Sequence, residues 1–224
     1  MAMPTFASKA IKYFTKLAAQ NNLPSSVQIL NPYEKAEVNK AVKEFYQKFY
    51  NDDQKRIYVL GINPGRFGGG LTGISFTDPV ALKKYCGIDN QLRNKEELSS
   101  KFVYEVINHF GGVNKFFSNF FLSAVYPLAL IKNGKNYNYY DDNKLFSNLK
   151  PQLIASLKEQ IKFGADRKVV ICLGKKNAGY LKILNDELKL FSKIEVLDHP
   201  RFIMQYRKKK INYYINQYIN ALNQ

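Results

Sequence analysis

The sequence predicts an α/β protein, with a three-layer α/β/α arrangement around a four-stranded parallel sheet. Four short apolar segments alternate along the chain with stretches in which apolar residues recur at helical spacing. Strands that alternate with helices are joined by right-handed crossovers, which place helices on both faces of a parallel sheet. No internal repeat or low-complexity linker interrupts the 224 residues, so we expect a single domain over 1–224.

The four predicted strands are short segments, and the first two are apolar runs suited to burial within a parallel sheet. The four segments are RIYVLGI at 56–62, FFLSAVYP at 120–127, RKVVICLG at 167–174 and KIEVLDH at 193–199.

The predicted helices precede, connect and follow these strands. Pro32 precedes the second of them, Gly111 and Gly112 stop the fourth, and Pro151 is tolerated in the first turn of the fifth. The helical ranges are 5–20, 33–50, 79–86, 99–110, 149–162, 175–190 and 203–222.

The composition restricts the class of protein. The chain has 34 Lys and Arg against 18 Asp and Glu, a net charge of +16, which is typical of a protein that binds a polyanion such as DNA. A lysine-rich surface that serves solubility alone is the alternative. No segment approaches the roughly 20 apolar residues of a membrane span, and the N-terminus lacks the apolar core of a signal peptide. We expect a cytoplasmic monomer with no membrane partner.

The cysteine and histidine content gives no sign of a metal site. Cys86 and Cys172 lie far apart without C-x-x-C spacing, and the two histidines, His109 and His199, do not cluster with them. We therefore expect two buried thiols in a reducing compartment, and neither a metal nor a cofactor.

The most unusual segment is the loop after the first strand, which carries six glycines between residues 61 and 73. Residues 68–73, GGGLTG, match the dinucleotide fingerprint G-x-G-x-x-G formally. That fingerprint requires the glycines at a direct strand-to-helix turn, whereas no helix is predicted here before Pro79. LGKKN at 173–177 also lacks the hydroxyl residue of a phosphate-binding loop. An ordinary long connection is the structural alternative.

The residues G-I-N-P-G-R-F-G-G-G-L-T-G-I-S-F, at 61–76, resemble the first motif of the uracil-DNA glycosylase superfamily. They are most similar to the single-strand-selective monofunctional (SMUG-type) branch, whose motif reads G-M-N-P-G-P-F-G-x-x-x-T-G-x-P-F. The second motif of that family begins with His-Pro after the last strand, and Asp198-His199-Pro200-Arg201 occupies this place. The resemblance implies a uracil-DNA glycosylase-like fold.

The resemblance also implies an activity and residue roles. Cleavage of an N-glycosidic bond passes through an oxocarbenium-like sugar and leaves negative charge on the base. In this family the residue matching Asn63 orients the water, and the one matching His199 donates a hydrogen bond to the developing oxyanion. The residue matching Phe76 stacks on the flipped base, while the loop lines the pocket, here Gly65, Phe67 and Gly69. Each side chain also has a structural interpretation: Asn63 as a turn cap, His199 as a strand-end histidine and Phe76 as core.

The middle motif departs from the family pattern. The family usually has an asparagine three residues before its proline, where it reads the Watson–Crick edge of the base. In SAVYP, residues 123–127, this position is Ala124, and Ser123 beside it is a candidate to supply part of the missing hydrogen bonding. A site without those hydrogen bonds discriminates less, so we expect xanthine as well as uracil to be accepted.

The segment after His199 is predicted to contact DNA. It carries cations without a single acidic residue up to the C-terminus, and Phe202, Ile203 or Met204 are candidates to enter the base stack when a base is extruded. The same three residues could form the buried face of a helix. The predicted phosphate-binding cations are Arg201, Arg207, Lys208, Lys209 and Lys210.

Together these features predict a monofunctional DNA glycosylase of base excision repair that acts on DNA containing deaminated bases. A non-catalytic nucleic-acid-binding protein with the same fold is the first alternative, and a hydrolase or transferase of free nucleosides is the second. The tyrosine-rich stretch 132–144 is expected to form a solvent-facing hairpin or an exposed loop near the site, and no site residue is assigned to it.

Overall fold

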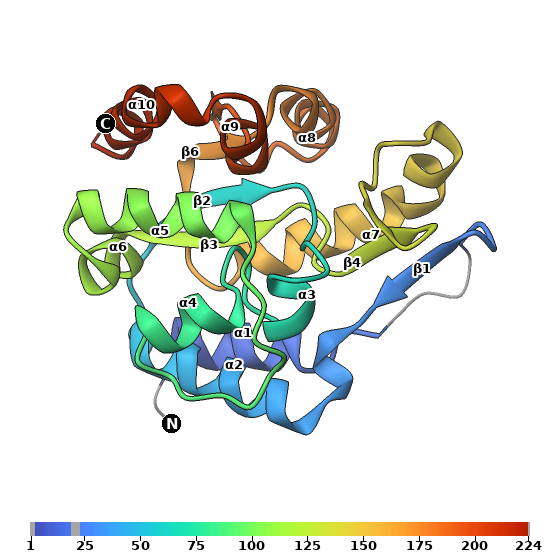
Figure 1. Cartoon of the computed structure of the whole chain (residues 1–224). Helices are drawn as coiled ribbons and strands as arrows, with labels where there is room; N and C mark the ends of the chain where they lie inside the picture. Colours follow the sequence, from blue (N-terminus) through green and yellow to red (C-terminus); the bar gives the residue numbers. More distant parts are fainter. Residues whose placement is uncertain (1–2, 19–22, 224) are drawn as a thin grey trace.

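Four parallel strands form the central sheet of the computed structural model, which describes residues 3–18 and 23–223 (Figure 1). All four strands lie where the sequence predicts them. In the order in which they pair, β3-β2-β6-β7, they are β3 (Phe120–Ala124), β2 (Arg56–Gly61), β6 (Ala165–Leu173) and β7 (Lys193–Leu197). The predicted α/β class and the four-stranded parallel sheet are confirmed.

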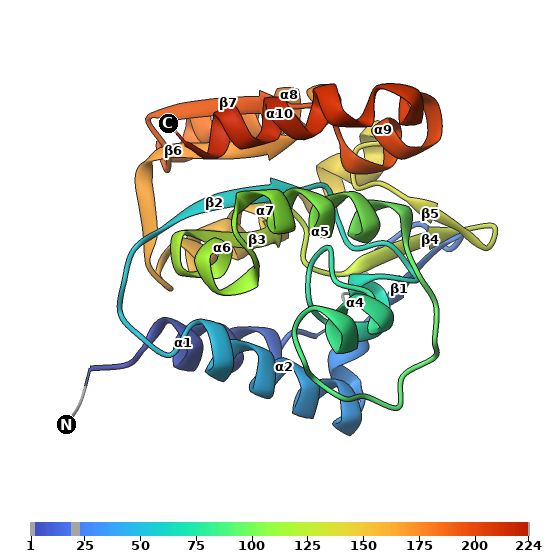
Figure 2. The ribbon, with the colours of Figure 1, turned by 60° about the vertical axis from the view of Figure 1, so that its left-hand side comes forward.

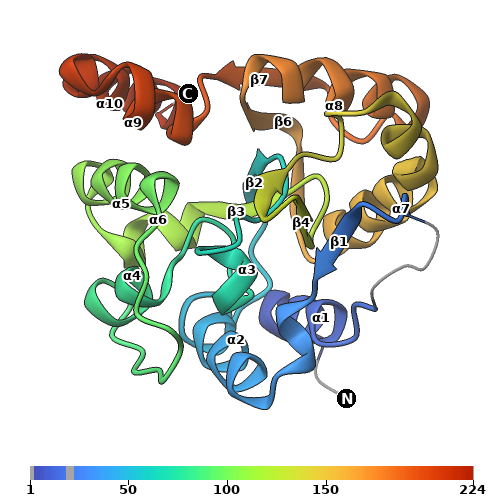
Figure 3. The same ribbon diagram turned by 45° about the vertical axis from the view of Figure 1, so that its right-hand side comes forward.

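One face of the sheet is covered by α5 (Leu98–Phe110), α6 (Val113–Asn119) and α10 (Ile211–Leu222). Val59 and Leu122 of neighbouring strands meet Val103 of α5 and Leu222 of α10 there. Figure 3 shows these helices on one side of the strands, with α9 (Pro200–Tyr206) above α5. The layer forms because every second residue of each strand points to the same face.

The other face is covered by α1 (Phe6–Phe14), α7 (Asn143–Ile161) and α8 (Lys175–Leu188). The ring of Tyr58 lies 4.8 Å from that of Phe121 on this face, and Phe6 of α1 lies 5.0 Å from Phe121. Tyr58 donates a 2.6 Å hydrogen bond to the carbonyl oxygen of Gln160 in α7. The two faces together make the predicted three layers.

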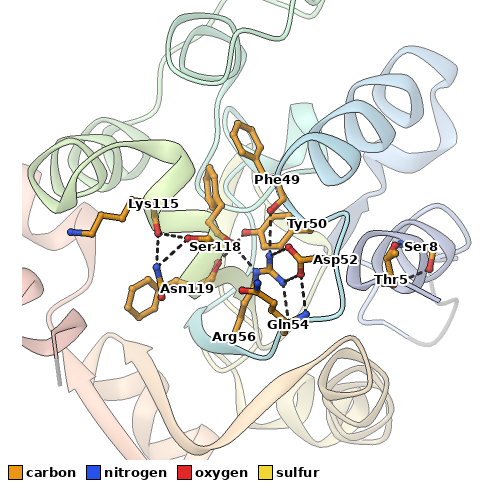
Figure 4. A network of polar contacts seen from close by, with 12 residues as sticks. Thr5, Ser8, Phe49, Tyr50, Asp52, Gln54, Arg56, Lys115, Ser118 and Asn119 are labelled. Carbon is orange, nitrogen blue, oxygen red and sulfur yellow. Dashed lines mark hydrogen bonds and ion pairs between the residues drawn. The ribbon is translucent and has the colours of Figure 1, made fainter. Parts of the chain in front are cut away.

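Arg56, at the start of β2, is fully buried inside a cage of acceptors (Figure 4). Its two terminal nitrogens each donate a 2.8 Å hydrogen bond to Asp52, and Nε donates to the carbonyl oxygen of Phe117 at 2.7 Å. The carbonyl oxygens of Gln54 and Phe49 accept the remaining bonds. This network anchors the N-terminal end of β2 to the helix that precedes it, α2 (Ala36–Phe49).

A second sheet was not predicted. It is antiparallel, in the order β1-β4-β5, and consists of β1 (Val27–Leu30), β4 (Ala129–Lys132) and β5 (Lys135–Tyr137). The strands are only three or four residues long, too short for a period of two to stand out. β1 pairs with a strand about 100 residues further on, and no local sequence pattern predicts that pairing. β4 and β5 form a hairpin over 129–137 that overlaps the stretch 132–144, where a solvent-facing hairpin was expected, but β4 itself is mostly buried.

Four helix boundaries differ from the prediction. Helix 33–50 is divided into η1 (Pro32–Glu34) and α2, and the last helix into α9, η2 (Lys208–Lys210) and α10. α7 begins earlier than expected, because Asp142 caps it by accepting a hydrogen bond from Leu145 N, so Pro151 lies inside the helix. The N-terminal helix ends at Phe14, and residues 19–20 of its expected range lie outside the described part. Two short helices complete the chain, α3 (Gly69–Thr72) and α4 (Pro79–Lys84).

Candidate functional site

A pocket of about 380 Å³ opens beyond the carboxyl ends of β2, β3 and β7. This is where parallel α/β sheets bind their ligands. Figure 2 shows the segments that surround it at one end of the molecule: the loop after β2, the β4–β5 hairpin and α9. Its lining residues are Gly61, Ile62, Asn63, Pro64, Gly65, Ser75, Phe76, Glu97, Ser99, Ala124, Asn136, Asn138, His199, Arg201, Phe202, Gln205 and Tyr206.

Asn63 stands two residues beyond β2, and its side chain is held by the end of β5 and the residues that follow it. Nδ2 donates a 3.0 Å hydrogen bond to the carbonyl oxygen of Tyr137, and Oδ1 accepts a 3.2 Å hydrogen bond from Tyr139 N. These bonds define which amide atom is nitrogen. They leave one N–H and one lone pair of the oxygen for a ligand or water in the pocket.

His199 stands two residues beyond β7 and caps α9. Its Nδ1 accepts a 3.2 Å hydrogen bond from Arg201 N, so the ring carries its proton on Nε2. Burial and, to a smaller extent, the positive charge of Arg201 together lower the pKa of His199 to about 4. The imidazole is therefore neutral at pH 7. It presents Nε2–H as a hydrogen-bond donor that no other described residue engages.

Phe76 faces His199 across the pocket, with 6.0 Å between the ring centroids. Its φ of 57° lies in the left-handed region, which is strained for a bulky residue. The ring also lies against the backbone of Gly61, where a Cβ would stand 2.4 Å from the Phe76 ring. Gly61 is needed because only glycine leaves room for this aromatic wall.

Comparison with known proteins agrees with this geometry. The family model for the uracil DNA glycosylase superfamily matches residues 47–223. The chain belongs to the uracil-DNA glycosylase superfamily. It is similar to the crystal structure of wild-type SMUG2 from Pedobacter heparinus, with 42% identity and a TM-score of 0.95, over 99% of this chain and 98% of that one. No curated protein matches the chain. The fold and the SMUG-type resemblance are thereby confirmed, and the protein is a DNA glycosylase, a hydrolase of N-glycosyl bonds.

The glycosylase pocket brings together seven of the residues singled out from the sequence. They are Asn63, Gly65, Phe76, Ala124, His199, Arg201 and Phe202. Phe67 and Gly69 belong to the same loop but do not line the pocket. The loop turns away after Gly65 because Gly68 N and Gly70 N both donate to the carbonyl oxygen of Gly65, which starts the short helix α3.

Ser123 does not replace the missing asparagine. Strand alternation turns its side chain to the opposite face of β3, where it is buried and donates a hydrogen bond to Gln160 of α7. Gln160 in turn donates to the carbonyl oxygen of Ala124 at 3.2 Å. The expectation that Ser123 contacts the base is therefore wrong, and Ser123 instead supports the wall that Ala124 forms.

The three candidate wedge residues after His199 differ in their exposure to solvent. Ile203 is fully buried and Met204 packs on the core, whereas Phe202 is 37% exposed at the pocket mouth. Tyr206 lies beside Phe202, with 5.7 Å between the ring centroids, and the Arg207 guanidinium lies over the Phe202 ring at 5.3 Å. Lys208, Lys209 and Lys210 are exposed in η2, outside the pocket.

Several pocket residues of the glycosylase were missed from the sequence. Asn136 and Asn138 come from the hairpin segment to which no site residue was assigned, and Asn63 is bonded to the backbone between and beside them. The high asparagine content of 132–144 was the sequence feature that could have indicated pocket residues in this segment. The other missed residues are Ser75, Ser99, Gln205, Tyr206 and Glu97. Glu97 matters most among them, because it is the single acidic side chain among the described residues that line the pocket.

Glu97 lies just before α5, and its backbone N donates a 2.8 Å hydrogen bond to Asp78, the cap of α4. Burial raises the pKa of its carboxyl group to about 7; Arg201 opposes this shift and Asp78 adds to it.

Within the described residues, no group of three or more His, Cys, Asp and Glu side chains could hold a metal ion. No helix of that part of the chain is long and apolar enough to cross a membrane.

Proposed function

We propose that this enzyme is a monofunctional DNA glycosylase that releases deaminated bases, uracil and xanthine, from DNA. The observation that carries the proposal is the meeting of Asn63, Phe76 and His199 in one pocket at the carboxyl end of the sheet. These are the residues for which the family resemblance implies water positioning, base stacking and stabilisation of the leaving group.

The reaction breaks the bond between C1′ and the base nitrogen, and its electron pair leaves on the base. Water adds its oxygen to C1′, and the proton that it loses passes to the departing base anion, directly or through solvent. Asn63 orients this water through the N–H and the lone pair that Tyr137 and Tyr139 leave unused. His199 donates Nε2–H to the base oxygen on which charge develops, and such a fixed donor in a partly buried site lowers the barrier. A neutral imidazole suits this role because Nε2–H can donate a hydrogen bond to the base anion without the ring first having to be protonated.

Ala124 supports a broad base preference. It forms the pocket wall where the family usually has an asparagine, and its methyl group offers no hydrogen bond. A pocket that reads a base through fewer bonds rejects alternatives less strongly. Uracil and xanthine share a ring N–H beside a carbonyl group, and the wall at Ala124 excludes neither.

The DNA backbone is held outside the pocket in this proposal. Arg201, Arg207 and the exposed lysines of η2 lie on and beside α9, where phosphates flanking an extruded nucleotide would pass. Phe202 is the wedge, since it is the exposed member of its triplet at the pocket mouth. Phosphate contacts of this kind position the protein without reading sequence.

Base release from labelled oligonucleotides tests the proposal. Oligonucleotides with one uracil, xanthine or hypoxanthine are incubated with wild type, Asn63→Ala and His199→Ala, and abasic sites are cleaved with alkali. Product from uracil and xanthine with wild type, and about 100-fold less with either variant, is expected. Uracil cleavage alone would remove xanthine from the proposal.

The alternatives predict different outcomes in the same assay. A non-catalytic DNA-binding protein would give no abasic product on any base, and Asn63→Ala would bind DNA as wild type does. A nucleoside hydrolase would release bases from free deoxyuridine at a rate that does not depend on salt.

A further inference from the structure

Glu97 is the single acidic side chain among the described residues that line the glycosylase pocket. It reaches the pocket from the long segment between α4 and α5, so no position in either sequence motif accounts for it. Acidic side chains are unfavourable beside DNA phosphates, and a carboxyl group inside the pocket of a protein of net charge +16 requires a reason.

The carboxyl group is seated on the glycine-rich loop. A Cβ on Gly65 would stand 1.8 Å from its Oε1, and a Cβ on Gly68 would stand 1.9 Å from its Oε2. Any side chain at either position would displace the carboxyl group. These two glycines therefore make room for Glu97, and its carboxyl group lies against the backbone of the loop, in the pocket that Asn63 also lines.

Within the described residues, neither carboxyl oxygen of Glu97 takes part in a hydrogen bond or an ion pair, although the group is partly buried. Its charged neighbours are Arg201 on α9 and Asp78 at the start of α4. His199, on the same pocket, is neutral at pH 7. Lys101 of α5 is paired with Glu96 instead, at 2.6 Å. A buried carboxyl group without a partner is unfavourable unless a ligand supplies one.

We propose that Glu97 contacts the flipped base directly and, in its neutral form, donates a hydrogen bond to a base carbonyl oxygen. A neutral carboxyl group places one donor and one acceptor side by side, as a primary amide does. It is therefore complementary to a ring N–H next to a carbonyl group, the edge that uracil, xanthine and hypoxanthine share. Because this edge is common to the three bases, Glu97 adds affinity for each of them and leaves the broad preference at Ala124 unchanged.

The protonation state is suited to this role. Burial raises the pKa of the Glu97 carboxyl to about 7, so a large fraction is neutral at physiological pH. Above that pKa the carboxylate accepts hydrogen bonds only and repels a base carbonyl group. The affinity for uracil should therefore fall as the pH rises through the pKa of Glu97.

The inference rests on the proposed glycosylase function, and it is tested with full-length wild type, Glu97→Gln, Glu97→Ala and Glu96→Gln. Glutamine has the shape and the donor–acceptor pair of the neutral acid but does not titrate. The readouts are kcat/KM on a uracil oligonucleotide between about pH 5.5 and pH 8.5, and the affinity for an oligonucleotide with 2′-fluorinated deoxyuridine. Fluorine makes the oxocarbenium-like sugar unfavourable, so this probe is bound without being cleaved.

In wild type, kcat/KM and probe affinity should fall roughly tenfold from the acidic to the alkaline end. Glu97→Ala should be about tenfold weaker at the acidic end, Glu97→Gln should restore most of that loss, and both variants should give flat pH profiles. Glu96→Gln, at an exposed neighbour, should behave as wild type. Thermal melting of each variant identifies any loss of folding.

Two results would overturn the inference while leaving the glycosylase function intact. One is a Glu97→Gln variant as inactive as Glu97→Ala, which would mean that the carboxylate acts on the water as a base. The other is equal probe affinity in wild type and Glu97→Ala. Failure of wild type to release any base would instead overturn the proposed function, and probe binding would still report whether Glu97 contacts the base.

Discussion

The side-chain amide of Asn63 donates a 3.0 Å hydrogen bond to the carbonyl oxygen of Tyr137, which ties the loop after β2 to the end of the second sheet. Asn63→Asp removes the donor and places a carboxylate against that carbonyl oxygen. We expect this variant to lose roughly 1–3 kcal/mol of unfolding free energy, and to lose base excision more than about tenfold, because the amide is no longer oriented. Urea unfolding and single-turnover kinetics measure the two effects. Asn133→Asp, in the turn of the hairpin, is the control.

Gly61→Ala should misplace the aromatic wall of the pocket. The new Cβ would stand 2.4 Å from the Phe76 ring, so the ring or the strand end must move, which costs about 1–3 kcal/mol. Excision should fall because Phe76 no longer faces His199. Gly179→Ala in α8 is the matched control: nothing lies within 4 Å of its added Cβ, and helix propensity should make it slightly more stable. A Gly61→Ala variant with wild-type kinetics would contradict a role for the Phe76 position.

Asp52→Asn should destabilise the protein from a site far from the pocket. Arg56 is fully buried and would keep its carbonyl acceptors but lose the charge of Asp52, whose side chain is 37% exposed. Because water screens the exposed carboxylate, we expect a loss of about 1–2 kcal/mol of unfolding free energy, less than for a fully buried pair. Chemical denaturation measures this, with kcat/KM of the folded fraction unchanged. Asp186→Asn, which breaks the exposed pair with Lys182, should leave the denaturation midpoint unchanged.

His199 and Glu97 should give the folding stability opposite pH dependences. The folded-state pKa of His199 is lowered to about 4, so the unfolded chain gains a proton first and the stability falls as the pH drops from 6.5 towards 4. The folded-state pKa of Glu97 is raised from 4.5 to about 7, so its contribution is present below 4.5 and is lost as the pH rises through 7. Between pH 4.5 and pH 6.5 the two groups therefore change the unfolding free energy of wild type in opposite directions.

The corresponding variants separate the two contributions. Relative to wild type, Glu97→Gln should show an unfolding free energy that rises more steeply with pH between about pH 5 and pH 6. The unfolding free energy of His199→Gln should rise less steeply with pH than that of wild type, or should fall. Each difference is at most about 1.4 kcal/mol per pH unit. Parallel curves for all three proteins would mean that neither group titrates abnormally.

Replacing Lys208, Lys209 and Lys210 with glutamine should weaken DNA binding and flatten its salt dependence. For every lysine–phosphate ion pair that the substitutions remove, the slope of log affinity against log salt should decrease by about 0.7–0.9. Affinities between roughly 50 and 200 mM salt measure this. The control replaces Lys35, Lys40 and Lys43, at and in α2 on the side of the molecule opposite α9 (Figure 1). An equal effect of both sets would indicate attraction by net charge alone.

The sequence was sufficient to predict the central sheet and to place the residues of the two motifs at the ends of its strands. Strand segments such as 56–62 are visible because apolar character is local, and Asn63 and His199 follow strand ends whose position the same pattern indicates. Phe76 could be assigned from its motif. Its strained backbone and its dependence on Gly61 could not, since both arise from contacts between segments.

The sequence by itself determined which residues we propose for the reaction: an amide, an imidazole and an aromatic ring at the carboxyl ends of parallel strands. Only the tertiary structure decided what surrounds them. The direction of Ser123 depends on one step of strand alternation, and the second sheet depends on a pairing between strands about 100 residues apart. Glu97 enters the pocket because Gly65 and Gly68, some 30 residues earlier, leave space for its carboxyl group. Burial and close approach are properties of the folded chain, and a linear pattern does not contain them.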